Sequence, residues 1–151
     1  MKNAKLILIQ SIVILISLNV FSVHASPFKG VNETRLIIEE VDEEHAKCGI
    51  TKSLIDAAVR IPLSNSKLKV TSRVVETYIY ANVNVRAMSS TCAINISLEF
   101  KKYIPSQGSG SFWEAGGLAV WSKNNSPTMV SNSLESFTKE LIGEWLKQNT
   151  N

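Results

Sequence analysis

The sequence predicts an α+β fold: an antiparallel sheet of four to five strands with two helices on one face. The order is β-α-β-β-β-β-α, or β-α-β-β-β-α if residues 67–88 form one bent strand. Two neighbouring runs, residues 78–88 and 91–100, alternate apolar and polar side chains. Two other runs, residues 50–61 and 130–145, repeat apolar residues at helical spacing. One-sided alternation is typical of an antiparallel sheet with one face against the core, so the helices are expected to cover that one face.

Strand and helix alternate in the N-terminal half of the predicted domain. Residues 34–41 (TRLIIEEV) have a β-rich centre and predict a first strand. The acidic DEEHAKCG that follows predicts a solvated loop. Helical spacing then begins, with Thr51 as a plausible N-cap, and Pro62 predicts that the helix ends just before it. Residues 67–74 predict a short strand.

The two alternating runs predict a β-hairpin, because only a short polar loop, residues 89–91, separates them. Its inner face consists of isoleucine, valine, alanine and leucine side chains. Cys92, at the head of the second run, has the same parity as those residues. The pattern therefore places Cys92 on the core side of the sheet.

The C-terminal third predicts a loop, a strand and a long helix. PSQGSG, residues 105–110, is a loop by composition, and residues 112–122 read as a strand that Gly116-Gly117 weakens or bulges. Ser126 before Pro127 is a good cap and first residue for the helix. The apolar stripe of this helix runs to about residue 148 and comprises Val130, Leu134, Phe137, Leu141 and Trp145.

The first 25 residues have the three parts of a secretory signal peptide: a basic head, an apolar stretch and a small-residue cleavage site at Val23-His24-Ala25. The alternative is an uncleaved anchor helix, but polar residues interrupt the apolar stretch. Cleavage leaves a flexible lead-in over residues 26–33 and a single α+β domain over residues 34–149, with no membrane span. The predicted location is the periplasm or the extracellular space.

Cys48 and Cys92 are the two cysteines of the chain, so only one intramolecular pairing exists. Exported proteins meet an oxidising compartment, which favours a structural disulfide. A reactive thiol is the alternative, since His45 precedes Cys48 by three residues. The compartment and the absence of a CxxC motif favour the disulfide.

Charge and motifs exclude several functions. Cleavage would remove two of the 16 basic residues and none of the 13 acidic ones, which leaves a net charge of +1 and argues against nucleic acid as a partner. His45 among acidic neighbours is a weak basis for a metal site, because zinc usually needs three or four donors. No G-x-S-x-G elbow or phosphate-binding loop occurs. We therefore expect no cofactor, no metal and no catalytic residue.

Five segments in this order carry a resemblance: CGITKSLIDAAV, KLKV, ETYIYANVNV, TCAINISLEF and SLESFTKELIGEWLKQN. They resemble a group of small, uncharacterised exported proteins of Gram-negative bacteria. More distantly, the layout is similar to the α/β domains of the TolB amino-terminal region and of the outer-membrane lipoproteins that activate penicillin-binding proteins. The resemblance implies a protein that binds other envelope proteins.

The outer face of the hairpin is the predicted binding surface; it carries Tyr78, Tyr80, Asn82, Asn84 and Arg86. Tyrosine and arginine are favoured at interface anchors, although β-propensity alone also explains tyrosines on a strand. The favoured function is a non-catalytic binding module for an envelope protein or a cell-wall component.

Two alternatives to a binding module stay open. A small hydrolase of cell wall or other polymer would use two of Glu76, Glu99 and Glu114. A secreted enzyme inhibitor would insert the loop around residues 105–111 into its target.

Overall fold

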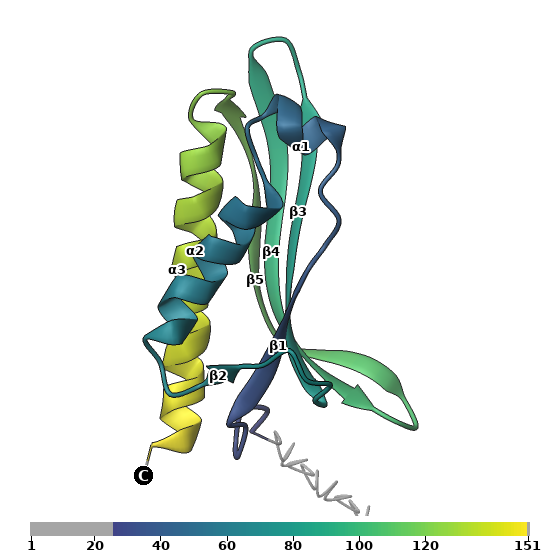
Figure 1. Cartoon of the computed structure of the whole chain (residues 1–151), viewed down its shortest axis with the longest axis vertical. Coiled ribbons are helices and arrows are strands. Elements are labelled where there is room, and N and C mark those ends of the chain that lie inside the picture. The colour runs from purple at the N-terminus through teal and green to yellow at the C-terminus, as the bar shows by residue number, and fades with distance from the viewer. Residues whose placement is uncertain (1–25, 151) are drawn as a thin grey trace, which may run out of the picture.

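The computed structural model describes residues 26–150 and consists of a five-stranded sheet with its two long helices, α2 and α3, on one side (Figure 1). The elements in chain order are β1 (Glu33–Ile38), α1 (Glu43–Lys47), α2 (Lys52–Ser64), β2 (Lys69–Val70), β3 (Thr77–Ala87), β4 (Thr91–Ile104), β5 (Gly108–Ser122) and α3 (Ser126–Asn149). The α+β class and the two long helices on one face are confirmed. The proposed signal peptide lies outside the described residues.

The sheet is mixed, with the strand order β2-β1-β3-β4-β5. The pairs β3-β4 and β4-β5 are antiparallel, but β1 runs parallel to both β2 and β3. The prediction of a purely antiparallel sheet is therefore wrong. Between β1 and the strands that flank it, the chain passes through α1 and α2, and such a crossover brings strands back in the same direction.

The predicted hairpin is present, with Ala87 opposite Cys92 and Thr77 opposite Lys102. Its inner face is buried under α2 and α3, as the alternation predicted. The stripe of α3 supplies the other side of the core, where Val130, Leu134 and Leu141 are fully buried. The core therefore lies between one sheet face and the helices and leaves the opposite face of the sheet uncovered.

The acidic segment before Cys48 forms a short helix, so the prediction of a solvated loop there is wrong. The Asp42 carboxylate accepts hydrogen bonds from the backbone N–H groups of Glu44 and His45, and the Asp42 backbone N–H donates to Nδ1 of the His45 ring. This reciprocal arrangement satisfies free donors of the first turn. Its hydrogen bonds to His45 lower the pKa of the Asp42 carboxyl below its usual value.

Two further helix boundaries differ from the prediction. Pro62 lies inside α2, which ends at Ser64. A proline in the last turn removes only one intrahelical bond, and Pro62 and Leu63 are both buried, which offsets that loss. At the start of α3, Asn125 is the cap residue without a side-chain cap bond, whereas the Ser126 hydroxyl donates to the Ser122 carbonyl.

The last two strands form a longer hairpin than predicted. β5 begins at Gly108, so the predicted loop shrinks to a turn at the tip of an extension that bends away from the helices (Figure 1). The register shifts between Phe100 and Lys101, opposite Trp113 and Ser111, which makes Phe112 the extra residue. The bulge therefore lies near Phe112, and the prediction of a bulge at Gly116-Gly117 is wrong. β2 is reduced to two residues.

Adjacent Gly116 and Gly117 provide a matched pair of substitutions. A Cβ on Gly116 would lie 2.7 Å from the Ile96 carbonyl oxygen, whereas one on Gly117 meets no atom within 4 Å. We expect Gly116→Ala to lower the free energy of unfolding by about 1–3 kcal/mol through this backbone clash. Gly117→Ala should leave it within roughly 0.5 kcal/mol. Urea unfolding followed by circular dichroism measures both, and equal stabilities would contradict the close approach.

Residues 26–33, predicted as a flexible lead-in, include a buried aromatic side chain. Phe28 is 1% exposed and its ring centroid lies 4.6 Å from that of Phe100. Its backbone N–H donates to the Gln148 side chain, and the Asn149 amide donates to its carbonyl oxygen. The start of the described chain is thus joined to the end of α3.

Candidate functional site

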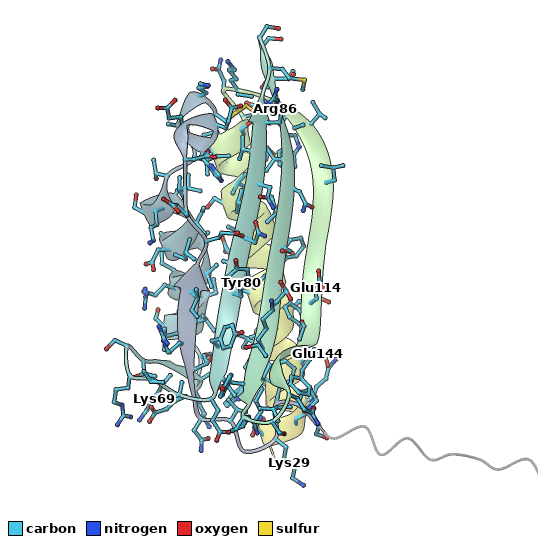
Figure 2. The ribbon with its side chains drawn as sticks, turned by 90° about the vertical axis from the view of Figure 1, so that its right-hand side faces the viewer. Lys29, Lys69, Tyr80, Arg86, Glu114 and Glu144 are labelled. Atoms are coloured by element: carbon cyan, nitrogen blue, oxygen red, sulfur yellow. A yellow bond between two sulfur atoms is a disulfide. The ribbon has the colours of Figure 1, made fainter. Side chains whose placement is uncertain are left out.

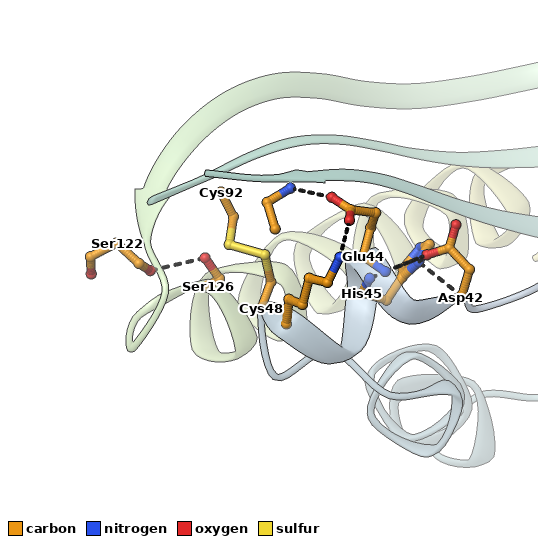
Figure 3. The surroundings of a disulfide bond; sticks show 9 residues. Asp42, Glu44, His45, Cys48, Cys92, Ser122 and Ser126 are labelled. Carbon is orange, nitrogen blue, oxygen red and sulfur yellow. Dashed lines mark hydrogen bonds and ion pairs between the residues drawn. A yellow bond between two sulfur atoms is a disulfide. The ribbon is translucent and has the colours of Figure 1, made fainter. Parts of the chain in front are cut away.

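A disulfide joins Cys48, just after α1, to Cys92, at the head of β4 (Figure 3). Both residues are buried, and no free cysteine occurs among the described residues. The predicted bridge is confirmed. It connects α1 and the start of α2 to the inner side of the sheet at the hairpin end.

His45 is buried beside the disulfide and bonds to the protein through both ring nitrogens. Nδ1 lies 2.6 Å from the Asp42 carboxylate and Nε2 lies 2.5 Å from the Val83 carbonyl oxygen. Within residues 26–150, no three side chains of the metal-binding types are grouped around one point. The ring therefore fastens α1 to β3, a structural role.

The uncovered sheet face carries the five residues of the predicted binding surface in one row along β3. Directly opposite them on β4 lie Lys101, Glu99, Ser97, Asn95 and Ala93, in the order from Tyr78 to Arg86. Figure 2 looks onto this face, with Tyr80 near its middle, Arg86 at the hairpin end and α3 behind the sheet. Asn84 donates a hydrogen bond to Asn82 within the row. We call this row, Tyr78 to Arg86, the β3 row.

Charged groups surround the tyrosines of the β3 row. The Lys101 ammonium lies 4.8 Å from the centre of the Tyr80 ring and 3.0 Å from the Glu99 carboxylate. Partial burial and then the Glu39 carboxylate raise the pKa of the Tyr80 hydroxyl, which stays protonated at neutral pH. One Glu39 oxygen is buried and accepts no hydrogen bond from the described part of the chain. The middle of the face thus offers aromatic rings, donors and acceptors together.

A hollow of about 490 Å³ adjoins the β3 row at Tyr78. Aliphatic side chains of β1 and of the loop before β3 form much of its wall. One basic and one acidic side chain, Arg35 and Glu76, also line it. Its lining residues are Arg35, Ile37, Val74, Val75, Glu76, Tyr78 and Tyr103. This combination of an apolar wall with a few polar groups is common in binding sites.

Only Tyr78 of the predicted site residues lines the hollow; Tyr80, Asn82, Asn84 and Arg86 lie farther along β3. Sequence reasoning missed Arg35, Val74 and Tyr103. Val74 is 89% exposed. Arg35 comes next to Tyr78 only through the parallel β1-β3 pairing, which the predicted sheet did not contain. Tyr103 continues the alternation of β4 and was visible in the sequence.

Two of the three glutamates considered for hydrolysis lie together. Glu99 and Glu114 face each other directly across β4 and β5, on the uncovered face. Glu76 lies apart from them and pairs with Lys102 at 3.6 Å. Neither member of the Glu99–Glu114 pair lines the hollow at Tyr78. The pair is thus on an open surface, and Lys101 compensates Glu99.

The fold and this surface define a small disulfide-bonded α+β domain with one uncovered sheet face. Within the described residues, no helix has the length and apolar character needed to cross a membrane. No family model matches the chain. No curated protein matches it either.

Solved structures with partial similarity to this chain include two lipoproteins and a PelC protein. A minor lipoprotein from Acinetobacter baumannii is 3% identical, with a TM-score of 0.46 and coverage of 77% of this chain and 91% of that one. A PelC dodecamer from Paraburkholderia phytofirmans is 11% identical, with a TM-score of 0.47 and coverages of 75% and 87%. Rare lipoprotein B from Shewanella oneidensis is 9% identical, with a TM-score of 0.40 and coverages of 76% and 95%.

Likeness at this level is too low to transfer a function. The resemblance to TolB amino-terminal domains and to activator lipoproteins stays a prediction.

Proposed function

We propose that this protein is an exported, non-catalytic binding module that recognises an envelope partner through the β3 row and the adjoining hollow. The carrying observation is that tyrosines, an arginine and an apolar hollow occupy a sheet face that no helix within residues 26–150 covers. Aromatic and arginine side chains provide most of the free energy of many protein interfaces. Polar neighbours such as Asn82 and Asn84 suit adaptable hydrogen bonding at the same surface.

The proposed location is the periplasm or the extracellular space. The leader pattern of residues 1–25 supports export, and a buried disulfide supports an oxidising compartment. An envelope protein or a cell-wall component is the partner class that this location makes available.

The proposal predicts the effect of replacing Tyr78, Tyr80 and Arg86 together by serine. Loss of two aromatic anchors and one charge should reduce the yield of partner cross-linked in the native envelope on the order of tenfold or more. The measurement is cross-linking in intact cells, followed by quantification of each cross-linked species.

A matched control changes three exposed residues of α3, in the helical layer, to serine: Asn132, Lys139 and Glu140. This variant should keep the full cross-linking yield. Thermal unfolding of both variants separates a lost surface from a lost fold. An undiminished yield for the sheet-face variant, with the fold intact, would refute the proposal.

The Glu99–Glu114 pair favours a polymer hydrolase as a second candidate function. Two carboxyl groups at opposed positions of neighbouring strands are the minimum that glycoside hydrolysis requires. The test is release of reducing ends from purified cell wall, comparing the unchanged chain with Glu114→Gln. Equal release by both, or none by the unchanged chain, would eliminate this candidate.

A further inference from the structure

The two edges of the sheet differ in how they are protected against pairing with another strand. β2 forms one edge and has only two residues, Lys69 and Val70. Short edge strands with lysine discourage pairing with a further chain. β5 forms the other edge and has 15 residues. Figure 2 shows it as the outermost strand, with α3 behind the sheet rather than alongside β5.

The hydrogen-bond pattern identifies which backbone groups of β5 are unpaired. The Tyr103 N–H bonds to Glu76 across β3 and β4, and the Lys123 N–H bonds to Ser90 across β4 and β5. Opposed residues of antiparallel strands alternate between bonded and non-bonded pairs. The backbones of odd-numbered residues between Trp113 and Trp121 therefore point toward β4. Those of Glu114, Gly116, Leu118 and Val120 point outward, away from the sheet.

A bulge protects only the end of this edge that lies near Gly108. It lies at Phe112, and the stretch from Trp113 to Trp121 beyond it pairs regularly with β4. This stretch contains one charge, no proline and no lysine. Leu118 is 74% exposed and Val120 is 59% exposed. Natural edge strands are normally protected by a lysine, a proline or a bulge, and residues 113–121 have none of these. The stretch is therefore suited to pair with another strand.

The same stretch, WEAGGLAVW, is nearly symmetric about its central residue, Gly117. In an antiparallel pairing of two copies about a two-fold axis at Gly117, Trp113 would face Trp121 and Ala115 would face Ala119. On the uncovered face, Leu118 would lie over Gly116 of the other copy, which has no side chain. Glu114 would face Val120 of the other copy. The two Glu114 carboxylates, the only charges in this stretch, would therefore not face each other.

We propose that two copies of this chain associate through residues 113–121 of β5 and form one continuous ten-stranded sheet. The outward backbone groups of the four even-numbered residues in each copy would then form about eight hydrogen bonds across the axis. Such an interface is isologous, as in most homodimers. It would place two β3 rows in the same surface, but it does not depend on what those rows bind.

The first test measures the mass of the oxidised full chain in solution over a range of protein concentration. We expect a concentration-dependent species of twice the monomer mass. Leu118→Pro removes an outward N–H that makes no bond within the sheet, a place where proline is tolerated on an edge strand. It should raise the dimer dissociation constant at least about tenfold, the consequence of losing backbone bonds and an apolar contact. Leu118→Ala keeps the N–H and should have a smaller effect.

The second test reports the register and does not depend on the proline variant folding. A Cβ at Gly117 meets no atom within 4 Å, so Gly117→Cys fits the fold. Facing Cα atoms of a non-bonded pair are about 4.5 Å apart, within the range for a disulfide. Gly117→Cys should therefore form a disulfide-linked dimer on mild oxidation. Val120→Cys is the control, because its two copies would be roughly 20 Å apart along the strands.

Three results would overturn the proposal. They are a monomeric chain at all concentrations, an undiminished dimer for Leu118→Pro, and equal cross-linking of the two cysteine variants. Pairing of β5 with a strand of another protein, in place of a second copy of this chain, would also contradict the proposed dimer. The serine variant of the β3 row should keep the dimer, so failure of this proposal is distinguishable from failure of the proposed function.

Discussion

Replacing Cys48 and Cys92 by alanine is expected to lower the free energy of unfolding by about 4 kcal/mol. The two residues are 44 positions apart, and the bridge restricts that length of chain in the unfolded state. The residues between them include α2, β2 and β3, so the bridge links the helical layer to the sheet. Urea unfolding at neutral pH measures the loss.

Reduction of the unchanged chain provides the control for this prediction. Reductant should destabilise the unchanged chain by a similar amount and leave the double alanine variant unaffected. Because both sulfurs are buried, the reductant must act on partly or fully unfolded molecules, and the comparison is made at equilibrium. Equal stabilities of the oxidised chain and the double variant would contradict a stabilising role of the bridge.

Phe28→Ala should have the second largest effect, a loss of about 3 kcal/mol. Its side chain is buried against Phe100, so truncation removes apolar burial and leaves a cavity under the sheet. The substitution should also release residues 26–33 from the end of α3. Hydrogen exchange at the Gly30 amide, which donates to the Asn149 side chain, would report that release.

Phe112→Ala is the matched control, since Phe112 is an exposed phenylalanine in the bulge of β5. We expect it to cost clearly less, about 1 kcal/mol, because a side chain that is 40% exposed loses less apolar burial on truncation than one that is 1% exposed. A small effect of Phe28→Ala, similar to that of Phe112→Ala, would show that residues 26–33 behave as the flexible lead-in of the sequence prediction.

The disulfide and Phe28 act at opposite ends of the same layer. Cys48 and Cys92 join helices and sheet at the hairpin end, and Phe28 joins the N-terminal segment to Phe100 and to the end of α3. Both contacts lie on the covered side of the sheet. Their loss should therefore destabilise the domain without altering side chains of the β3 row, which makes stability and partner binding separable in experiment.

The sequence by itself determined the features that depend on local periodicity and composition. Alternation between Ile79 and Phe100 specified the hairpin, its buried face and the row of polar side chains opposite. Helical spacing specified the stripe of α3, and two cysteines allowed only one bridge. These properties follow from side-chain direction along a strand or helix, which neighbours in the sequence already determine.

Tertiary structure alone decided the direction of β1, the position of the bulge at Phe112 and the burial of His45. Each depends on a partner far away in the chain. The direction of β1 depends on its pairing with β3, and the bulge depends on the register between β4 and β5. The burial of His45 depends on its contact with the Val83 carbonyl. The same holds for the hollow, since Arg35 and Tyr78 become neighbours only when β1 pairs with β3. Local patterns carry no information on such pairings, because many registers bury the same apolar residues and packing selects among them.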